Sequence, residues 1–174
     1  MNAKLDNYLV QKYPKIFINR YESPMVTCLC FGFEHGDGWF WLLDQLCYSI
    51  QSHIDMNNEY KKEEDKKIPQ VVATQVKEKF GTLNFYFSGG DDYIDGMVRL
   101  VENMSANVCE FCGTTENVGY TSGWISTICK DCYSNSSERI SNRPWKERKN
   151  SLPTEISTEL RKIKLDKLNN KNLQ

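Results

Sequence analysis

Hydrophobic residues recur at the spacing of an α-helix in three stretches of the chain. Near the start, Leu5, Tyr8 and Leu9 lie three or four positions apart and Pro14 closes the segment, which predicts a helix over residues 3–13. The apolar positions of the two longer stretches are Trp39, Leu42, Leu43, Leu46, Cys47, Ile50 and Ile54, and then Ile94, Met97, Val98, Val101 and Met104. Each set falls on one helical face, so we expect amphipathic helices.

Glycine-rich turns precede both longer helices. Asp37, within Gly36-Asp37-Gly38, is well placed as the N-cap of the first, and Asp91 or Asp92 can cap the second. Backbone amides in such turns can also cradle an anion, although neither turn matches a known phosphate-binding fingerprint. Ordinary turns between elements are therefore the default interpretation.

Alternating apolar and polar residues predict a β-hairpin in the middle of the chain. Its strands are expected over Val71 to Lys77 and Thr82 to Phe87, with Gly81 near the turn. In the second strand Leu83, Phe85 and Phe87 would share one face, and Asn84, Tyr86 and Ser88 the other. A further strand is predicted over Met25 to Phe33.

These elements predict an α+β fold, in which a small antiparallel sheet is packed by amphipathic helices and carries an appended four-cysteine zinc ribbon. We divide the chain into an α+β core over residues 1–106, a zinc-ribbon module over 107–134, a polar and basic linker over 135–153, and a C-terminal helix and tail over 154–174.

Charge and composition limit the function classes. The chain has 174 residues and a net charge of −1, which argues against a protein that coats nucleic acid or anionic membrane with its whole surface. The polar start does not have the form of a signal peptide, and no apolar run approaches the roughly 18 residues of a membrane-spanning helix. We expect a cytoplasmic protein that makes no use of a membrane.

Four of the seven cysteines form two pairs with the spacing of a zinc ribbon. These are Cys109 and Cys112, then Cys129 and Cys132 after sixteen intervening residues. Two such pairs can point four sulfurs at one ion, and Gly113 supplies the positive φ that a knuckle needs. Four thiolates leave no open coordination position, so the expected cofactor is one structural Zn²⁺.

The remaining cysteines and the two histidines carry weaker signals. Cys28, Cys30 and Cys47 are predicted to be buried free thiols. A general base at His35, beside Glu34 and Asp37, would make the chain a small hydrolase, but the sequence contains no recognisable catalytic constellation. We therefore do not expect an enzyme.

Lysines and aromatic residues around the glycine-rich turns outline a candidate pocket for an anionic ligand that carries a base. The residues proposed to bind this ligand are Asp37, Trp39, Lys77, Lys79, Phe80, Tyr86 and Asp91. A second candidate surface is the segment 138–149, which holds five basic and two acidic residues around Trp145. Such a segment can hold a nucleic-acid strand by phosphate contact and stacking, or it can be a solvated linker.

The chain resembles a loose family of small, uncharacterised bacteriophage proteins over residues 30–133. The resemblance rests on the two cysteine pairs and on four further motifs, which are Gly36-Asp37-Gly38-Trp39, Lys77-Glu78-Lys79-Phe80-Gly81-Thr82-Leu83 with Phe85-Tyr86, Ser88-Gly89-Gly90-Asp91, and Ile94-Asp95-Gly96-Met97. Family members often carry Cys where this chain has His35, which implies that this position is not a fixed catalytic group. The resemblance implies a phage-encoded protein in the host cytoplasm.

Three functional hypotheses follow. The first is a non-enzymatic, anti-defence binding protein that sequesters a nucleotide signal or binds a host protein, as small accessory phage proteins often do. The second is a nucleic-acid-binding regulator that uses the zinc ribbon and the segment 138–149. The third is the small hydrolase. A homo-oligomer is plausible because a terminal amphipathic helix needs a partner face.

Overall fold

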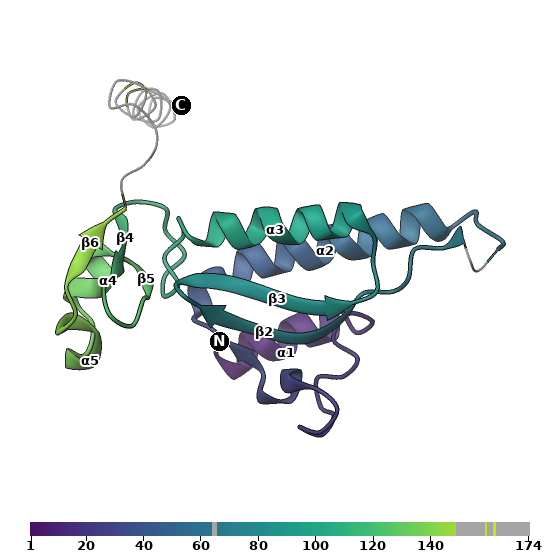
Figure 1. Ribbon diagram of the computed structural model, residues 1–174, viewed down its shortest axis with the longest axis horizontal. Coiled ribbons are helices and arrows are strands. Elements are labelled where there is room, and N and C mark those ends of the chain that lie inside the picture. The colour runs from purple at the N-terminus through teal and green to yellow at the C-terminus, as the bar shows by residue number, and fades with distance from the viewer. Residues whose placement is uncertain (64–65, 149–158, 160–161, 163–174) are drawn as a thin grey trace, which may run out of the picture.

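The computed structural model describes residues 1–63 and 66–148, together with Glu159 and Lys162. The protein is α+β, as predicted, with two three-stranded sheets and a set of helices (Figure 1). None of the helices in this described part is long and apolar enough to cross a lipid bilayer. Apart from Glu159 and Lys162, the predicted C-terminal helix and tail lie outside the described residues.

The elements follow one another along the chain in an order that separates two parts. The first part contains α1 (Ala3–Lys12), the 3₁₀ turn η1 (Cys28–Phe31), β1 (Phe33–Glu34), the 3₁₀ turn η2 (Asp37–Trp39), α2 (Phe40–Asn58), β2 (Val72–Lys79), β3 (Thr82–Ser88) and α3 (Asp92–Ser105). The second contains β4 (Val118–Thr121), β5 (Thr127–Cys129), α4 (Lys130–Ser134), α5 (Glu138–Ser141) and β6 (Trp145–Glu147). We call residues 1–108 the main body and residues 109–148 the four-cysteine module.

The first sheet has the order β1-β2-β3 and confirms the predicted hairpin. β2 and β3 are antiparallel, with Lys77 opposite Asn84 and Lys79 opposite Thr82. Phe80 and Gly81 form the two-residue turn, and both have positive φ, as a tight hairpin turn requires. β1 runs parallel to β2, so the sheet is mixed rather than purely antiparallel.

The predicted strand over Met25 to Phe33 is wrong except for its last residue. The chain instead turns through η1, because the Thr27 hydroxyl accepts a hydrogen bond from the Leu29 amide and donates one to Thr74 O. This turn leaves Cys28 exposed and Cys30 half-buried, contrary to the prediction that both are buried. Cys47 is buried, as predicted, and burial raises the pKa of its thiol.

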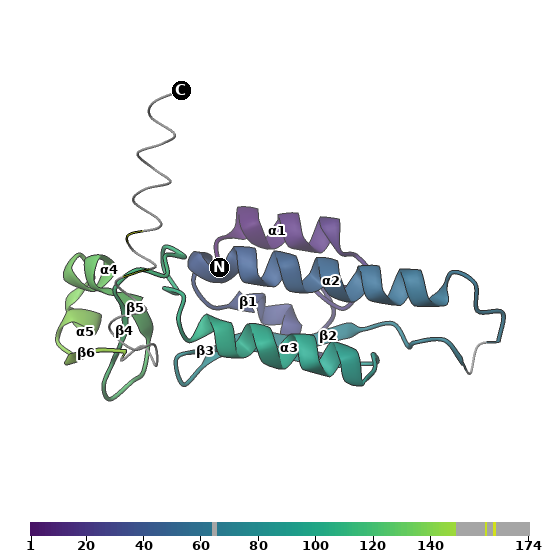
Figure 2. The same cartoon turned by 90° about the horizontal axis from the view of Figure 1, so that it is seen from above.

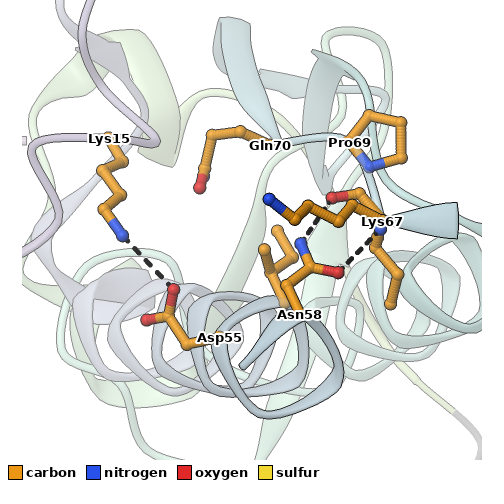
Figure 3. A pocket seen from close by; sticks show the side chains of 8 residues that line it. Lys15, Asp55, Asn58, Lys67, Pro69 and Gln70 are labelled. Carbon is orange, nitrogen blue, oxygen red and sulfur yellow. Dashed lines mark hydrogen bonds and ion pairs between the residues drawn. The ribbon is translucent and has the colours of Figure 1, made fainter. Parts of the chain in front are cut away.

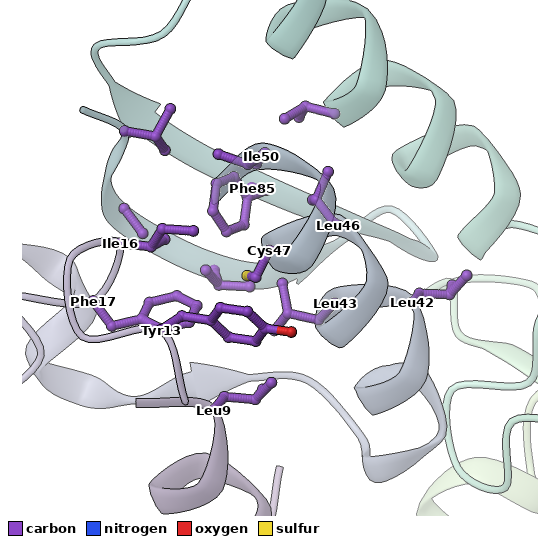
Figure 4. Packing of buried hydrophobic residues seen from close by; sticks show 14 of the residues in the cluster. Leu9, Tyr13, Ile16, Phe17, Leu42, Leu43, Leu46, Cys47, Ile50 and Phe85 are labelled. Carbon is purple, nitrogen blue, oxygen red and sulfur yellow. The ribbon is translucent and has the colours of Figure 1, made fainter. Parts of the chain in front are cut away.

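The main hydrophobic cluster lies between α2, the sheet and the segment after α1 (Figure 4). All the apolar residues predicted for the inner face of α2 are buried. Tyr13, Ile16 and Phe17 complete the cluster from a segment with no apolar periodicity. The Tyr13 hydroxyl donates to the backbone oxygen of Asp44, so this polar group is paired inside the protein.

The helix caps agree with the prediction for α3 but not for α2. Asp91 caps α3 by accepting a hydrogen bond from the Ile94 amide. Asp37 instead begins η2, and its carboxylate accepts hydrogen bonds from the backbone and side-chain amides of Asn2 at 2.7 and 2.8 Å. The chain therefore enters α2 through a 3₁₀ turn, without a side-chain cap.

Helix α3 closes the outer edge of β3. The Leu83 amide donates to Ser105 Oγ at 2.8 Å, and the Phe85 amide donates to Glu102 Oε1 at 2.9 Å. An edge strand with unpaired amides would offer a template for another chain, so these side chains protect the sheet.

The four-cysteine module forms a second sheet with the order β5-β4-β6. β6 and α5 fall within residues 135–153, which we predicted to be a linker. The described part of this segment, residues 135–148, belongs to the module because β6 pairs with β4, with Trp145 opposite Thr121. The Trp145 indole also donates to Ile128 O at 3.1 Å, which anchors the segment.

Replacing Ser105 with alanine tests the edge protection. Ser105→Ala leaves the buried Leu83 amide unpaired, and we expect a loss of about 1–3 kcal/mol in the free energy of unfolding. Ser52→Ala on α2 is the control, since the hydrogen bond from the Ser52 hydroxyl to the Met56 sulfur is exposed to solvent. Urea denaturation measures both, and equal stabilities of the two variants would contradict the assigned role of Ser105.

Candidate functional site

The sulfur atoms of Cys109, Cys112, Cys129 and Cys132 form a compact cluster that could hold one metal ion. The four sulfurs lie within 4.8 Å of one another, and the Cys112 and Cys129 sulfurs are 3.7 Å apart. A tetrahedral zinc site with Zn–S bonds of about 2.3 Å requires sulfur–sulfur distances of about 3.8 Å. The predicted ligand set is therefore brought together in a geometry that suits zinc.

Two local turns position these cysteines. In the first, the Gly113 amide donates to Cys109 O at 2.9 Å, and Gly113 has a φ of +78°, as predicted. In the second, Cys129 ends β5 and its sulfur accepts a hydrogen bond from the Cys132 amide at 3.4 Å, at the start of α4.

Backbone amides favour the thiolate form at one of the four sulfurs. Burial opposes a negative charge on Cys109, but hydrogen bonds from backbone amides of Cys129, Cys112 and Phe111 hold its pKa below the usual value for a thiol. A thiolate is the form of cysteine that binds metals, so Cys109 favours a soft cation, whereas burial raises the pKa of Cys112 in the same turn.

The first cysteine turn docks directly on the loop that precedes α2. The Gly38 amide donates to Glu110 O at 2.8 Å, and the Gly36 amide donates to Glu110 Oε1 at 3.0 Å. The indole of Trp39 is fully buried and donates to Val108 O at 2.8 Å. Figures 1 and 2 show the resulting arrangement, with the module at the end of the main body where α2 begins.

Glycine is required at this contact because two backbones approach each other closely. A Cβ atom on Gly38 would lie 2.2 Å from Cys109 O and 2.5 Å from Gly113 N. A Cβ atom on Gly36 would lie 2.3 Å from Glu110 O. The glycine-rich turn therefore receives a carbonyl of the module, and not the anion considered in the sequence analysis.

The hairpin turn forms a second contact with the module. Thr127 of β5 donates to Gly81 O at 2.6 Å, and a Cβ atom on Gly81 would lie 2.7 Å from Ile125 Cγ2. Arg148 in turn donates to Thr127 Oγ1 at 3.3 Å. Two of the motifs that carry the family resemblance are thus contacts between the main body and the module.

Two buried titratable side chains lie beside the first contact. Burial raises the pKa of Glu110 to about 7 and lowers that of His35 to about 4. His35 is only 6% exposed and its Nδ1 lies 2.9 Å from Gly36 O. Since Glu34 and Asp37 pair with Gln75 and Asn2 rather than with His35, the geometry counts against the hydrolase hypothesis.

The structure does not gather the seven predicted ligand-binding residues into one pocket. Trp39 is inaccessible, and Asp37 is held by Asn2. Asp91 caps α3, and its Oδ2 lies 2.9 Å from His53 Nε2. Helix α3 begins at the end of the main body away from the start of α2 (Figure 1). The other four, Lys77, Lys79, Phe80 and Tyr86, all belong to the β2–β3 hairpin.

A hollow of about 520 Å³ near the end of α2 is a poor ligand site (Figure 3). Lys15 pairs with Asp55 at 3.2 Å, and the Asn58 side chain makes two hydrogen bonds with the backbone of Ile68. Because these polar groups satisfy one another, they offer little to a ligand. None of the seven predicted ligand-binding residues lines this hollow.

The structure describes residues 138–148 of the predicted nucleic-acid-binding segment, and Lys149 lies outside the described residues. Trp145 is half-buried, and Lys130 Nζ lies 4.7 Å from the centre of its ring, so one face of the indole already meets a cation. Arg148 lies over the Tyr120 ring, and Lys146 is exposed opposite Tyr120 in the register of β6 and β4.

Sequence reasoning missed the residues that join the two parts. Val108 and Glu110 offer backbone oxygens, and Thr127 a hydroxyl, to partners far away in the sequence. No local sequence pattern identifies such groups. Gly36 and Gly38 beside Trp39 could, however, have indicated a place where two backbones pack closely.

Comparison with known proteins finds no matching family model, no matching curated protein and no matching solved structure. The resemblance to phage proteins therefore stays a prediction, and function must be argued from the geometry.

A pair of glycine substitutions tests the contact at Gly38. Gly38→Ala places a methyl group against backbone atoms of the module, and we expect destabilisation by about 1–3 kcal/mol. Gly96→Ala is the control, because a Cβ atom there meets nothing within 4 Å and alanine should stabilise α3 by about 0.5–1 kcal/mol. Thermal unfolding measures both, and an unchanged melting temperature for Gly38→Ala would refute the contact.

Proposed function

We propose that the chain is a non-enzymatic binding protein, stabilised by one structural zinc ion, that captures single-stranded nucleic acid on the open face of its β2–β3 hairpin. The observation that carries the proposal is that Lys77, Lys79 and Tyr86 share one accessible face of this hairpin.

Zinc is the metal that the four-cysteine cluster fits best. A set of four thiolates is typical of structural zinc sites, and it leaves no coordination position for a substrate. The module contributes only a small buried cluster around Cys109, Val118, Ile128 and Cys129. Such a small core needs a further source of stability, which a bound metal supplies.

Two cysteine variants test the zinc site. Cys112→Ser removes one ligand and should abolish binding of one equivalent of zinc, whereas Cys28→Ser should retain it, although both thiols are exposed. Native mass spectrometry of gently purified protein measures the zinc content. One zinc retained by Cys112→Ser, or none bound by the unsubstituted protein, would refute the assignment.

The open face of the hairpin is polar, basic and aromatic. The register places Gln75, Lys77 and Lys79 of β2 on the same face as Thr82, Asn84 and Tyr86 of β3. The opposite face of the hairpin packs in the hydrophobic cluster. In Figure 1 the hairpin lies in front of α1, with α2 and α3 above it. The open face also has an acidic side chain at its edge, because Glu34 of β1 pairs with Lys77.

Basic and aromatic side chains also lie at the hairpin turn and in the module that contacts it. Phe80 in the turn is 76% exposed, and Lys79 Nζ lies 5.7 Å from the centre of its ring. The module contacts the hairpin turn through the hydrogen bond from Thr127 to Gly81 O. In the module, Arg148 lies over the Tyr120 ring, and Lys146 is exposed. Alternating basic and aromatic side chains suit a strand whose phosphates need cations and whose bases need flat rings.

A nucleotide signal is the second candidate ligand. A groove of about 400 Å³ beside Tyr86 favours it, because a small ligand needs a concave site. If the resemblance to phage proteins reflects common origin, the protein would then act against host defence by sequestering that signal. A single strand and a free nucleotide both carry a nucleobase and a phosphate, so the same side chains could bind either ligand.

The salt dependence of binding tests the proposed face. We expect a fluorescently labelled single-stranded oligonucleotide to bind more weakly as salt rises. The double variant Lys77→Ala/Lys79→Ala should reduce the steepness of log K against log salt by about 0.7 per lysine. Lys4→Ala/Lys62→Ala removes the same charge from exposed positions elsewhere and should bind like the unsubstituted protein. Fluorescence anisotropy from 20 to about 200 mM salt makes the comparison. Equal slopes for the two variants would place the strand elsewhere.

A further inference from the structure

The groove beside Tyr86 opens at the end of the hairpin face that lies away from the module. Its lining comes from residues 24–28 before and within η1, from Thr74 and Gln75 of β2, and from Tyr86 of β3. Tyr86 and Gln75 are paired across the two strands and belong to the same face as Lys77. The groove is therefore continuous with the basic surface.

The apolar wall of the groove is held in place although it is exposed. Met25 is 97% exposed, yet its amide donates to Ser23 Oγ at 3.2 Å and the Val26 amide donates to Ser23 O at 2.9 Å. Thr27 then ties this turn to β2 through its 2.9 Å hydrogen bond to Thr74 O. The lining of the groove thus combines an exposed methionine, on a backbone turn fixed by hydrogen bonds, with an aromatic ring, which suits a flat apolar group.

Gln75 gives the slot a polar edge with a fixed orientation. Its Nε2 donates to Glu34 Oε2 at 2.9 Å, which assigns the amide nitrogen to that side. No described residue donates to its Oε1, so this oxygen remains as an acceptor. Lys77 follows two positions along β2, about 7 Å away at the rise of a strand.

We infer that this groove is a nucleobase subsite, in which a base stacks on Tyr86 beneath Met25 and its phosphate lies at Lys77. The inference rests on the proposed function and names the part of the ligand that the groove takes. An apolar peptide side chain would fill the slot equally well, but it would make no use of Lys77 two residues along the same face.

The acceptor at Gln75 predicts a base preference. On the edge that faces the major groove in a duplex, adenine and cytosine carry an exocyclic amino group that can donate to Gln75 Oε1, whereas uracil and thymine present only a carbonyl acceptor there. Glu34 accepts from one N–H of Gln75 Nε2, so exchanging the positions of Oε1 and Nε2 would break that hydrogen bond, while the second N–H of Nε2 remains a donor beside the acceptor. Oligoadenylate and oligocytidylate should therefore bind more tightly than oligouridylate.

Homopolymer binding to three variants tests the subsite. Tyr86→Ala should weaken oligoadenylate binding about 5- to 150-fold, the range found for loss of one stacked base, and Met25→Ala should weaken it less. Phe31→Ala is the matched control, because Phe31 is an exposed apolar residue outside the groove. Circular dichroism checks that each variant is folded, and adenosine monophosphate as a competitor shows whether a free nucleotide suffices.

The outcomes separate the subsite from the proposed function. Weaker binding by Tyr86→Ala together with loss of base preference, while Phe31→Ala binds normally, supports the subsite for either source of the base. Unchanged binding by Tyr86→Ala and Met25→Ala, with the lysine variant still impaired, overturns the subsite and leaves the proposed function standing. If the unsubstituted protein binds neither oligonucleotides nor adenosine monophosphate at low salt, both fail.

Discussion

The backbone of the first cysteine turn rests on the backbone of residues 36–38, and the arrangement of the molecule depends on that contact. The Gly38 amide meets Glu110 O without a side chain between them, so the start of α2 has a fixed position against the module. The buried indole of Trp39 fixes the same point by its hydrogen bond to Val108 O. Since α2 carries the face on which the sheet and α1 pack, a metal ion in the module would also order the main body.

Elements with a regular hydrophobic period were predictable, whereas the contacts between them were not. The periodicity of α2 and α3 and the alternation in β3 each reflect which face is buried, and this information is local. The cysteine ligands were also predictable, because each pair closes its own turn. By contrast, a glycine-rich turn before a helix has the same sequence whether a phosphate or a carbonyl approaches it. β6 is three residues long and exists because β4 is there to pair with it.

The open face of the hairpin follows from the packing of its other face against the hydrophobic core. One face of a two-stranded ribbon supplies Leu83 and Phe85 to the core, so the alternate positions must face outward, and here they are basic, amide or aromatic. The contact between Gly81 and Thr127 holds the turn of this ribbon against a second sheet. A surface supported at both its inner face and its tip loses little entropy when a ligand binds, which favours recognition by a shallow site.

The contact between Trp39 and Val108 also bears on how the chain acquires its structure during synthesis. The two residues are 69 positions apart in the sequence. At 5–20 residues per second, the ribosome would take about 3–14 s to deliver Val108 after Trp39. During that interval the indole N–H of Trp39, just before α2, lacks its acceptor at Val108 O. The packing around Trp39 would then be completed only once Val108 and the first cysteine turn emerge, so any ion that this turn binds would act late in folding.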